Sequence, residues 1–153
     1  MKNKIIYIII GLIIIVIVVL SVQFIFDGKI DSKTQTSTTT DSYLYKDLIR
    51  IDSPIQNQKI SASGPVKVSG IARGNWYFEA SFPVQVLDSD GTVLGSGPVQ
   101  AQGDWMTTDF VPFTGEIDFT KPKGKTGSII FKKDNPSGLP ANDDSVSISI
   151  NFE

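Results

Sequence analysis

The segment Ser145–Phe152 decides the fold, because its sequence SVSISINF places an apolar residue at every second position. Side chains of a β-strand alternate between its two faces, so one face of this segment is apolar and the other is polar. Such alternation is typical of a half-buried strand whose apolar face covers a core.

Six other segments have the same alternation, or the length and turn-bounded composition of strands. They are Leu48–Asp52, Val66–Ile71, Phe78–Leu87, Thr92–Gln100, Phe110–Phe119 and Ser128–Phe131. No part of residues 48–153 has a convincing helical period. Seven short strands separated by turns are typical of a β-sandwich, so we expect an all-β fold for this range.

Turn and core residues can be assigned within this pattern. Asp90-Gly91 predicts a two-residue hairpin with a type I′ turn, because both residues accept a positive φ. Pro83 and Pro98 interrupt strand segments and lack an N–H, so we expect them at edges or bulges. The expected core includes Phe82, Phe113 and Ile148.

The chain before residue 48 begins with a segment suited to a membrane. Residues Ile5–Phe26 carry no charge. A helix of that length spans about 33 Å, enough for the roughly 30 Å hydrocarbon layer of a bilayer. Because Lys2 and Lys4 precede this segment, the positive-inside rule places the N-terminus inside and the C-terminal domain outside. We therefore expect a single-pass protein of the cell membrane.

Three alternatives to this anchor are less consistent with the sequence. A cleaved signal peptide requires small residues near its end, where Ser21–Phe26 supplies mostly bulky ones. A lipid anchor requires a cysteine, and the chain has none. A buried helix of a soluble protein rarely contains so long an uncharged run.

The residues between the anchor and the strands differ again in composition. Residues 27–47 are rich in Ser and Thr, including the run Thr34–Thr40, and such a run buries too little apolar surface to fold. We expect three parts: a cytoplasmic tip and transmembrane anchor at 1–26, a disordered Ser/Thr-rich linker at 27–47, and an ectodomain at 48–153.

The composition excludes several kinds of chemistry. The chain has no cysteine and no histidine, which excludes thiol and Ser-His catalysis, disulfides, and zinc or haem sites built on those residues. Its 14 Lys and Arg against 16 Asp and Glu offer no basic stripe for nucleic acid. We expect no cofactor and no nucleic-acid partner.

Three aromatic-rich blocks resemble a known family. They are Gly70–Val84, Gly103–Thr107 and Asp134–Pro140. In that order they are similar to the immunoglobulin-like domain of bacterial spore germination proteins, over roughly residues 48–153. The resemblance implies an immunoglobulin-like β-sandwich outside a bacterial membrane and implies no catalytic residues. One departure is Ala141, where the resemblance leads us to expect a glutamate.

Candidate ligand-binding residues lie in two of these blocks: Arg73, Asn75, Trp76, Tyr77 and Trp105. Tryptophan rings can be platforms for sugars or peptides, although in a small sandwich they more often belong to the core, which is the default interpretation here. Arg73 could bind an anionic ligand, but a structural pair with Glu79 or Asp104 is the favoured use.

Two sets of acidic residues have alternative interpretations. Asp134, Asn142, Asp143 and Asp144 offer oxygen ligands for calcium, yet they lack the spacing of a calcium loop, so turn formation is favoured and no metal is expected. The carboxylates of Glu79, Asp104 and Asp109 could suggest a glycosidase, but a small sandwich seldom has a deep cleft. We expect no enzymatic activity.

Two hypotheses for function follow. In the first, the ectodomain is a binding module that recognises an envelope polysaccharide or a cell-surface ligand. In the second, it is an assembly module that docks onto another exported or membrane protein of the envelope, with a role related to germination. Exposed aromatic side chains among polar neighbours at one end would favour the first, and buried ones with a bare apolar sheet face would favour the second.

Overall fold

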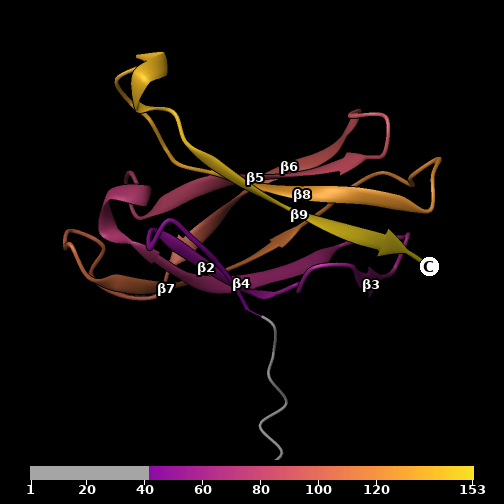
Figure 1. Ribbon diagram of the computed structural model, residues 1–153, viewed down its shortest axis with the longest axis horizontal. Helices are drawn as coiled ribbons and strands as arrows, with labels where there is room; N and C mark the ends of the chain where they lie inside the picture. The colour runs from indigo at the N-terminus through magenta and orange to yellow at the C-terminus, as the bar shows by residue number, and fades with distance from the viewer. Residues whose placement is uncertain (1–41) are drawn as a thin grey trace, which may run out of the picture. The chain divides into compact units, whose positions relative to one another are not determined.

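The computed structural model describes residues 42–153 (Figure 1). The predicted anchor at residues 5–26 and the linker up to residue 41 lie outside the described residues. Within the described part, no helix has the length and apolar character needed to cross a membrane.

The described chain folds into nine strands and two short 3-10 helices. In chain order these are β1 (Tyr43–Tyr45), β2 (Ile49–Ser53), β3 (Gln58–Ile60), β4 (Val66–Arg73), η1 (Gly74–Trp76), β5 (Ser81–Asp88), β6 (Val93–Ala101), β7 (Phe110–Ile117), β8 (Thr126–Lys132), η2 (Pro140–Asn142) and β9 (Ser145–Phe152). The all-β prediction is therefore confirmed, and each of the seven predicted segments contains a strand. The predicted number of strands is too small because β1 and β3, with three residues each, are too short to produce a period. Strand β1 falls within the range that composition assigned to the linker.

The strands form one curled sheet in the order β1-β2-β4-β7-β6-β5-β8-β9-β3. All neighbours are antiparallel except β3 and β9. Figure 1 shows β5, β6, β8 and β9 lying over β2, β4 and β7, as in a sandwich. The two layers are joined where Gln100 and Ala101 of β6 pair with Thr114 and Phe113 of β7.

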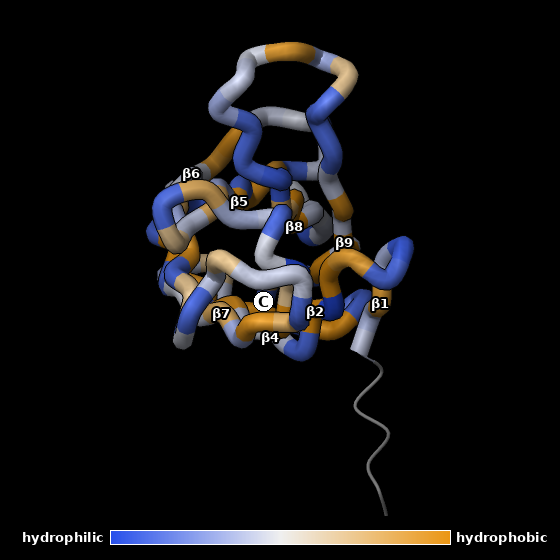
Figure 2. The backbone as a smooth tube through the Cα atoms, turned by 90° about the vertical axis from the view of Figure 1, so that its left-hand side faces the viewer, coloured by the Kyte–Doolittle hydropathy of each residue, from blue (hydrophilic) through white to orange (hydrophobic). Residues whose placement is uncertain are grey.

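The core lies between these layers and is built from the apolar faces of the alternating strands. Its largest fully buried side chains include Trp76, Phe82, Phe113, Phe131, Ile129 and Ile148. The three predicted core residues Phe82, Phe113 and Ile148 are thus confirmed. Figure 2 shows the hydrophobic stretches concentrated in the strands and the hydrophilic ones in the loops.

Two local predictions need correction. The hairpin between β5 and β6 forms as expected, but its turn is not type I′, because Gly91 alone has a positive φ, of 84°. Gly91 N–H donates to Asp88 C=O at 3.0 Å, and the β5–β6 register shifts by one residue beside the turn. This bulge accommodates the twist of the two strands, so Asp90 does not need a positive φ.

Strand β5 also begins later than predicted, at Ser81. Glu79 and Ala80 have positive φ angles of 50° and 61° and form a tight turn that is closed by hydrogen bonds between Phe78 and Ser81. Phe78 is consequently 40% exposed and lies outside the core.

The two prolines inside strands face each other, Pro83 in β5 and Pro98 in β6. Neither residue has an N–H, so this position can only be one where the two strands exchange no hydrogen bond. On its other side Pro98 meets no strand, because β7 pairs with β6 only at Gln100 and Ala101. Pro83 is likewise outside the ladder on its other side, because β8 pairs with β5 only from Val84 onward. Both prolines therefore lie where their strand has no second partner, as expected.

Candidate functional site

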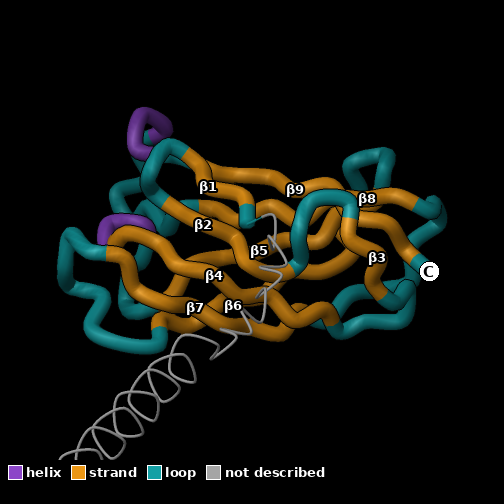
Figure 3. Tube along the Cα trace, turned by 60° about the horizontal axis from the view of Figure 1, so that its bottom comes forward, coloured by secondary structure: helices purple, strands orange, loops and turns teal. Residues whose placement is uncertain are grey.

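The predicted ligand-binding residues gather at one end of the sandwich, where η1, η2 and the β6–β7 loop (residues 102–109) lie (Figure 3). Backbone hydrogen bonds join these segments. Gly74 N–H donates to Asp109 C=O at 3.2 Å, and Asp134 N–H donates to Trp76 C=O at 3.0 Å. Residues distant in sequence are thereby held together as one surface.

Trp76 and Tyr77 form the buried floor of this end. Trp76 is fully buried and makes edge contacts with Tyr45 and Phe82, with ring centroids 6.4 and 6.5 Å apart. Its Nε1 has no hydrogen-bond partner among the described residues. The core interpretation of Trp76 is therefore confirmed.

Tyr77 is 4% exposed, and its hydroxyl donates to Val111 C=O at 2.7 Å. Burial raises the pKa of Tyr77, so the hydroxyl remains a donor throughout the physiological range. This hydrogen bond fixes β7 against the segment that follows η1. Tyr77, like Trp76, has too little exposed surface for its ring to be a platform for a ligand.

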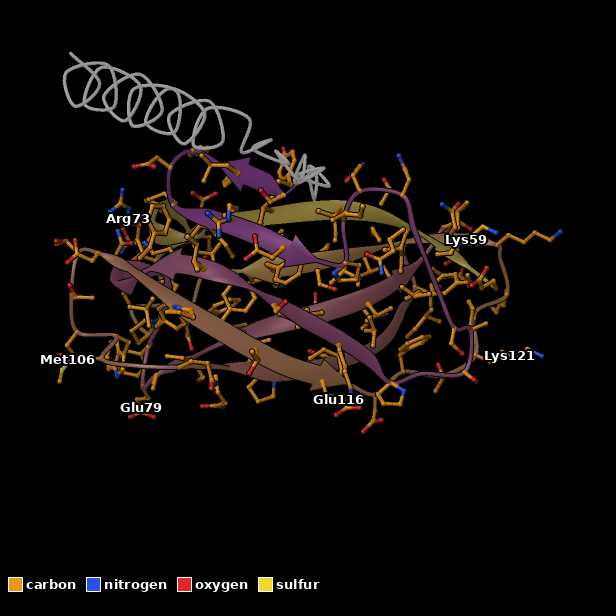
Figure 4. All side chains as sticks on the ribbon, turned by 90° about the horizontal axis from the view of Figure 1, so that it is seen from below. Lys59, Arg73, Glu79, Met106, Glu116 and Lys121 are labelled. Carbon is orange, nitrogen blue, oxygen red and sulfur yellow. The ribbon has the colours of Figure 1, made fainter. Side chains whose placement is uncertain are left out.

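Arg73 has a structural role, although with a different partner from those predicted. Its Nη2 bonds to the carboxylate of Asp47 at 2.6 Å, its Nη1 donates to Thr108 C=O at 3.3 Å, and its guanidinium stacks on Phe110 with 3.9 Å to the ring centroid. The predicted partners Glu79 and Asp104 make no ion pair with it, and Figure 4 shows Glu79 pointing away from Arg73. Sequence reasoning missed Asp47 because that residue lay in the range assigned to the linker.

A shallow depression of about 480 Å³ opens over this floor. It is lined by Gly74, Asn75, Tyr77, Trp105, Met106, Thr107 and Thr108. Trp105 is half-buried against the core, Asn75 is exposed and Met106 is 77% exposed. We call the residues Asn75, Trp105, Met106, Thr107 and Thr108 the loop-end surface.

Gly74 and Asp104 set the shape of this surface. A Cβ on Gly74 would collide with the carbonyl oxygens of Trp105 and Thr107, so only glycine lets η1 approach the β6–β7 loop this closely. The Asp104 carboxylate accepts a hydrogen bond from Met106 N–H at 3.0 Å, which closes the turn that presents Trp105 and Met106.

The acidic loop between β8 and β9 uses its side chains for its own hydrogen bonds. Asn135 Nδ2 donates to Asp143 at 2.7 Å, and Asn142 Nδ2 donates to Ser137 Oγ at 3.0 Å. Asp144 accepts from the Tyr45 hydroxyl at 3.1 Å and pairs with Lys46 at 3.4 Å. Asp134 is half-buried. Within residues 42–153, no three acidic side chains converge in a way that could hold a metal ion.

Sequence reasoning missed one buried carboxylate, Asp88 at the end of β5, which is 4% exposed. It accepts hydrogen bonds from the backbone N–H groups of Lys123 at 2.8 Å, Ser89 at 2.7 Å and Gly124 at 3.3 Å. These bonds, the one from Lys123 above all, hold the pKa of Asp88 below its ordinary value. The sequence did carry a signal for its burial, because Asp88 continues the every-second-residue pattern of Phe82, Val84 and Val86 on the buried face of β5.

One comparison with known proteins found a match, and that match agrees with this architecture. A family model described as the immunoglobulin-like domain of bacterial spore germination matches residues 48–138, more than half of the 153 residues. No curated protein and no solved structure matches the chain. The resemblance noted for the three aromatic-rich blocks is thereby confirmed, and the chain belongs to the family of immunoglobulin-like domains of bacterial spore germination.

Proposed function

We propose that this protein is a non-catalytic binding module of a bacterial cell envelope, and that its loop-end surface recognises an envelope polysaccharide. The observation that carries this proposal is the half-buried Trp105 beside the exposed Asn75 and Met106 in a shallow depression. An aromatic face with neighbouring amide and hydroxyl groups suits a sugar, whose rings are apolar on their faces and polar at their edges.

The same geometry argues against catalysis. The depression is shallow and is lined by no acidic or basic side chain. Glycoside hydrolysis requires two carboxyl groups about 5 to 9.5 Å apart across the scissile bond. None of the three carboxylates considered above, Glu79, Asp104 and Asp109, lines the depression, and Asp104 caps its own turn. Binding without turnover is the function that these residues support best.

Exported display of the domain is part of the proposal. It is supported by the uncharged segment 5–26 preceded by Lys2 and Lys4, which suits a single-pass anchor with the N-terminus inside. Protease added to wall-stripped cells should release a fragment that begins between residue 27 and Tyr43 of β1. A soluble secreted product that lacks residues 1–26 would contradict the anchor.

The binding experiment uses the full-length chain in non-ionic detergent and insoluble cell-wall polymer, with retention measured by sedimentation. Met106→Ala and Asn75→Ala should each lower retention several-fold, because both side chains are exposed at the depression and carry little folding energy. Leu139→Ala is the matched control, since Leu139 is 61% exposed and lies outside the depression. Equal retention of all three variants and the wild type would refute the role of the loop-end surface.

A second candidate function, docking onto another envelope protein, is favoured by one specific observation. Among the described residues 42–153, strand β1 pairs with β2 alone, and no strand of this range lies on its other edge. The side chains of Tyr43 and Leu44 in β1 are 42% and 52% exposed. An edge of this kind accepts a strand from a partner. Co-purification of one envelope protein that Leu44→Lys abolishes, together with no retention on wall polymer, would favour docking over polysaccharide recognition.

A further inference from the structure

The loop between β7 and β8 carries a set of lysines that neither the fold nor the proposed function uses. Lys121, Lys123 and Lys125 are all exposed, while Pro122 between the first two is buried. The three side chains therefore leave the loop on its outer side. Figure 4 shows Lys121 at the end of the sandwich opposite Arg73 and Met106. We call these three residues the lysine loop.

No acidic side chain of residues 42–153 forms an ion pair with the lysine loop. Residues 119–133 contain five lysines and no Asp or Glu, although Asp118 and Asp134 border this stretch and Asp90 lies near Lys123. Two nearby acids are already engaged, because Asp88 accepts from the loop backbone and Glu153 pairs with Lys59 at 3.3 Å.

The loop is held rigidly at its start, middle and end. Thr120 N–H donates to Leu94 C=O of β6 at 3.0 Å, and Phe152 N–H of β9 donates to Lys125 C=O at 2.9 Å. Between these points the buried carboxylate of Asp88 holds the N–H groups of Lys123 and Gly124. Burial of a carboxylate costs free energy unless the carboxylate accepts several hydrogen bonds. The hydrogen bonds that Asp88 accepts from Lys123 and Gly124 therefore fix the position of this loop. The ammonium groups are thus presented from a fixed backbone, which lowers the entropy lost on binding.

We propose that the lysine loop is a second binding surface, which binds a linear polymer whose charges are phosphate diesters. Lysine is a compact point charge that binds the oxygens of a phosphate diester without the bidentate geometry that the arginine fork provides. The described domain has two arginines, Arg50 and Arg73, and both are paired with aspartates elsewhere.

The surroundings favour a polymer over a membrane surface. From Lys121 to Lys125 the only apolar side chain is Pro122, and it is buried, so nothing in this stretch would insert into a bilayer. The three lysines occupy every second position of one five-residue segment, so their ammonium groups can contact several charges of one polymer chain. This proposal does not depend on the loop-end surface. Either proposal can be refuted while the other stands.

The test measures binding of the full-length chain, in non-ionic detergent, to poly(glycerol phosphate), with dextran as the neutral comparison. Each phosphate contact contributes a slope of about -0.7 to the dependence of log affinity on log salt concentration, so three contacts predict about a 20-fold loss between 50 and 200 mM salt. The triple variant K121Q/K123Q/K125Q should lose most of its affinity at low salt and nearly all of this salt dependence.

The matched control is K67Q/K132Q/K133Q, which removes the same charge from three lysines that lie outside the lysine loop. This control should bind within about two- to threefold of the wild type if the site is local. Thermal melts of both triple variants check that the fold is intact. An equal loss in the two triples, or equal binding of dextran, would overturn the proposal. A further result would also overturn the proposal: the lysine loop is needed for binding to micelles that contain phosphatidylglycerol, and the polymer is not bound. That result would assign the loop to a membrane surface.

Discussion

Replacement of Phe113 by alanine tests how the core is assembled. Phe113 is 1% exposed, and its ring lies 4.9 Å from the centroid of Phe82 and 6.0 Å from that of Phe131. Its ring edge also packs against the backbone of Gly70. Removal of a fully buried ring loses about 1.5 to 3 kcal/mol of transfer free energy. The residual cavity raises the total to about 3 to 5 kcal/mol, a large share of the roughly 5 to 15 kcal/mol that stabilises a domain.

The assay is urea unfolding of the full-length chain in non-ionic detergent, followed by tryptophan fluorescence. The chain has two tryptophans, Trp76 and Trp105, and both lie in the described domain, so the signal reports this domain alone. Phe78→Ala is the matched control, because the same side chain is deleted at a site that is 40% exposed. We expect the control to cost less than about 1 kcal/mol. A Phe113→Ala cost below about 1.5 kcal/mol, or one equal to the control, would refute the packing described here.

Three further predictions follow from the buried polar groups and the acidic loop. In the same urea assay, Trp76→Ala should lower the free energy of unfolding by about 3 to 5 kcal/mol. Trp76→Phe should lower it by roughly half as much, because the indole N–H that it removes has no partner among the described residues. A Phe variant as costly as the Ala variant would mean that this N–H is bonded. The folded pKa of Asp88 is below its ordinary value near 3.8, so its stabilising contribution is complete above that value and is lost as the pH falls through the lower folded value. Asp88→Asn should therefore flatten the fall in thermal midpoint at acidic pH, and an unchanged acid profile would contradict the hydrogen bonds to Lys123 and Gly124. Chelation of calcium should leave the thermal midpoint unchanged, because Asp143 and Asp144 are bonded within the protein. A tight site would add about 2.7 kcal/mol at a hundredfold excess over its dissociation constant, so a clear fall in the midpoint would identify a calcium site.

The core of the fold could be predicted from the sequence because alternation is a local signal. In β9 the buried Val146, Ile148 and Ile150 are two residues apart, so the period and the buried face can be determined together. The short strands β1 and β3 carry no such signal, since three residues cannot define a period. Their strand state depends on partners distant in the sequence, β2 for the first and β9 for the second.

The turn before β5 could not be predicted for a related reason. Phe78 and Ala80 continue the alternation of the strand, so the pattern extends through residues that the backbone places in a tight turn. Positive φ at Glu79 and Ala80 is uncommon for residues with a Cβ, and nothing in their side chains predicts it. The turn is instead fixed by the hydrogen bonds between Phe78 and Ser81 and by Ala101 N–H, which donates to Ala80 C=O at 2.8 Å.

The candidate site divides into residues that hold the scaffold and residues that a ligand can reach, and sequence reasoning could not separate the two. Arg73, Trp76 and Tyr77 looked like a binding loop because Arg and aromatic side chains are common in binding sites. Each of them contacts another segment of the chain: Arg73 contacts Asp47, Trp76 contacts Tyr45, and Tyr77 contacts Val111.

This division changes what membership of the family implies. The block Gly70–Val84 lies within the matched range, and its large side chains Trp76, Tyr77 and Phe82 are buried. Similarity at these positions is therefore evidence for a common core and gives no information on a common ligand. Replacement of Trp76 or Tyr77 by alanine would lower binding through loss of stability of the domain, without showing contact with a ligand. A ligand can be distinguished only through exposed positions such as Asn75 and Met106, where a change in side chain alters the surface and leaves the core intact.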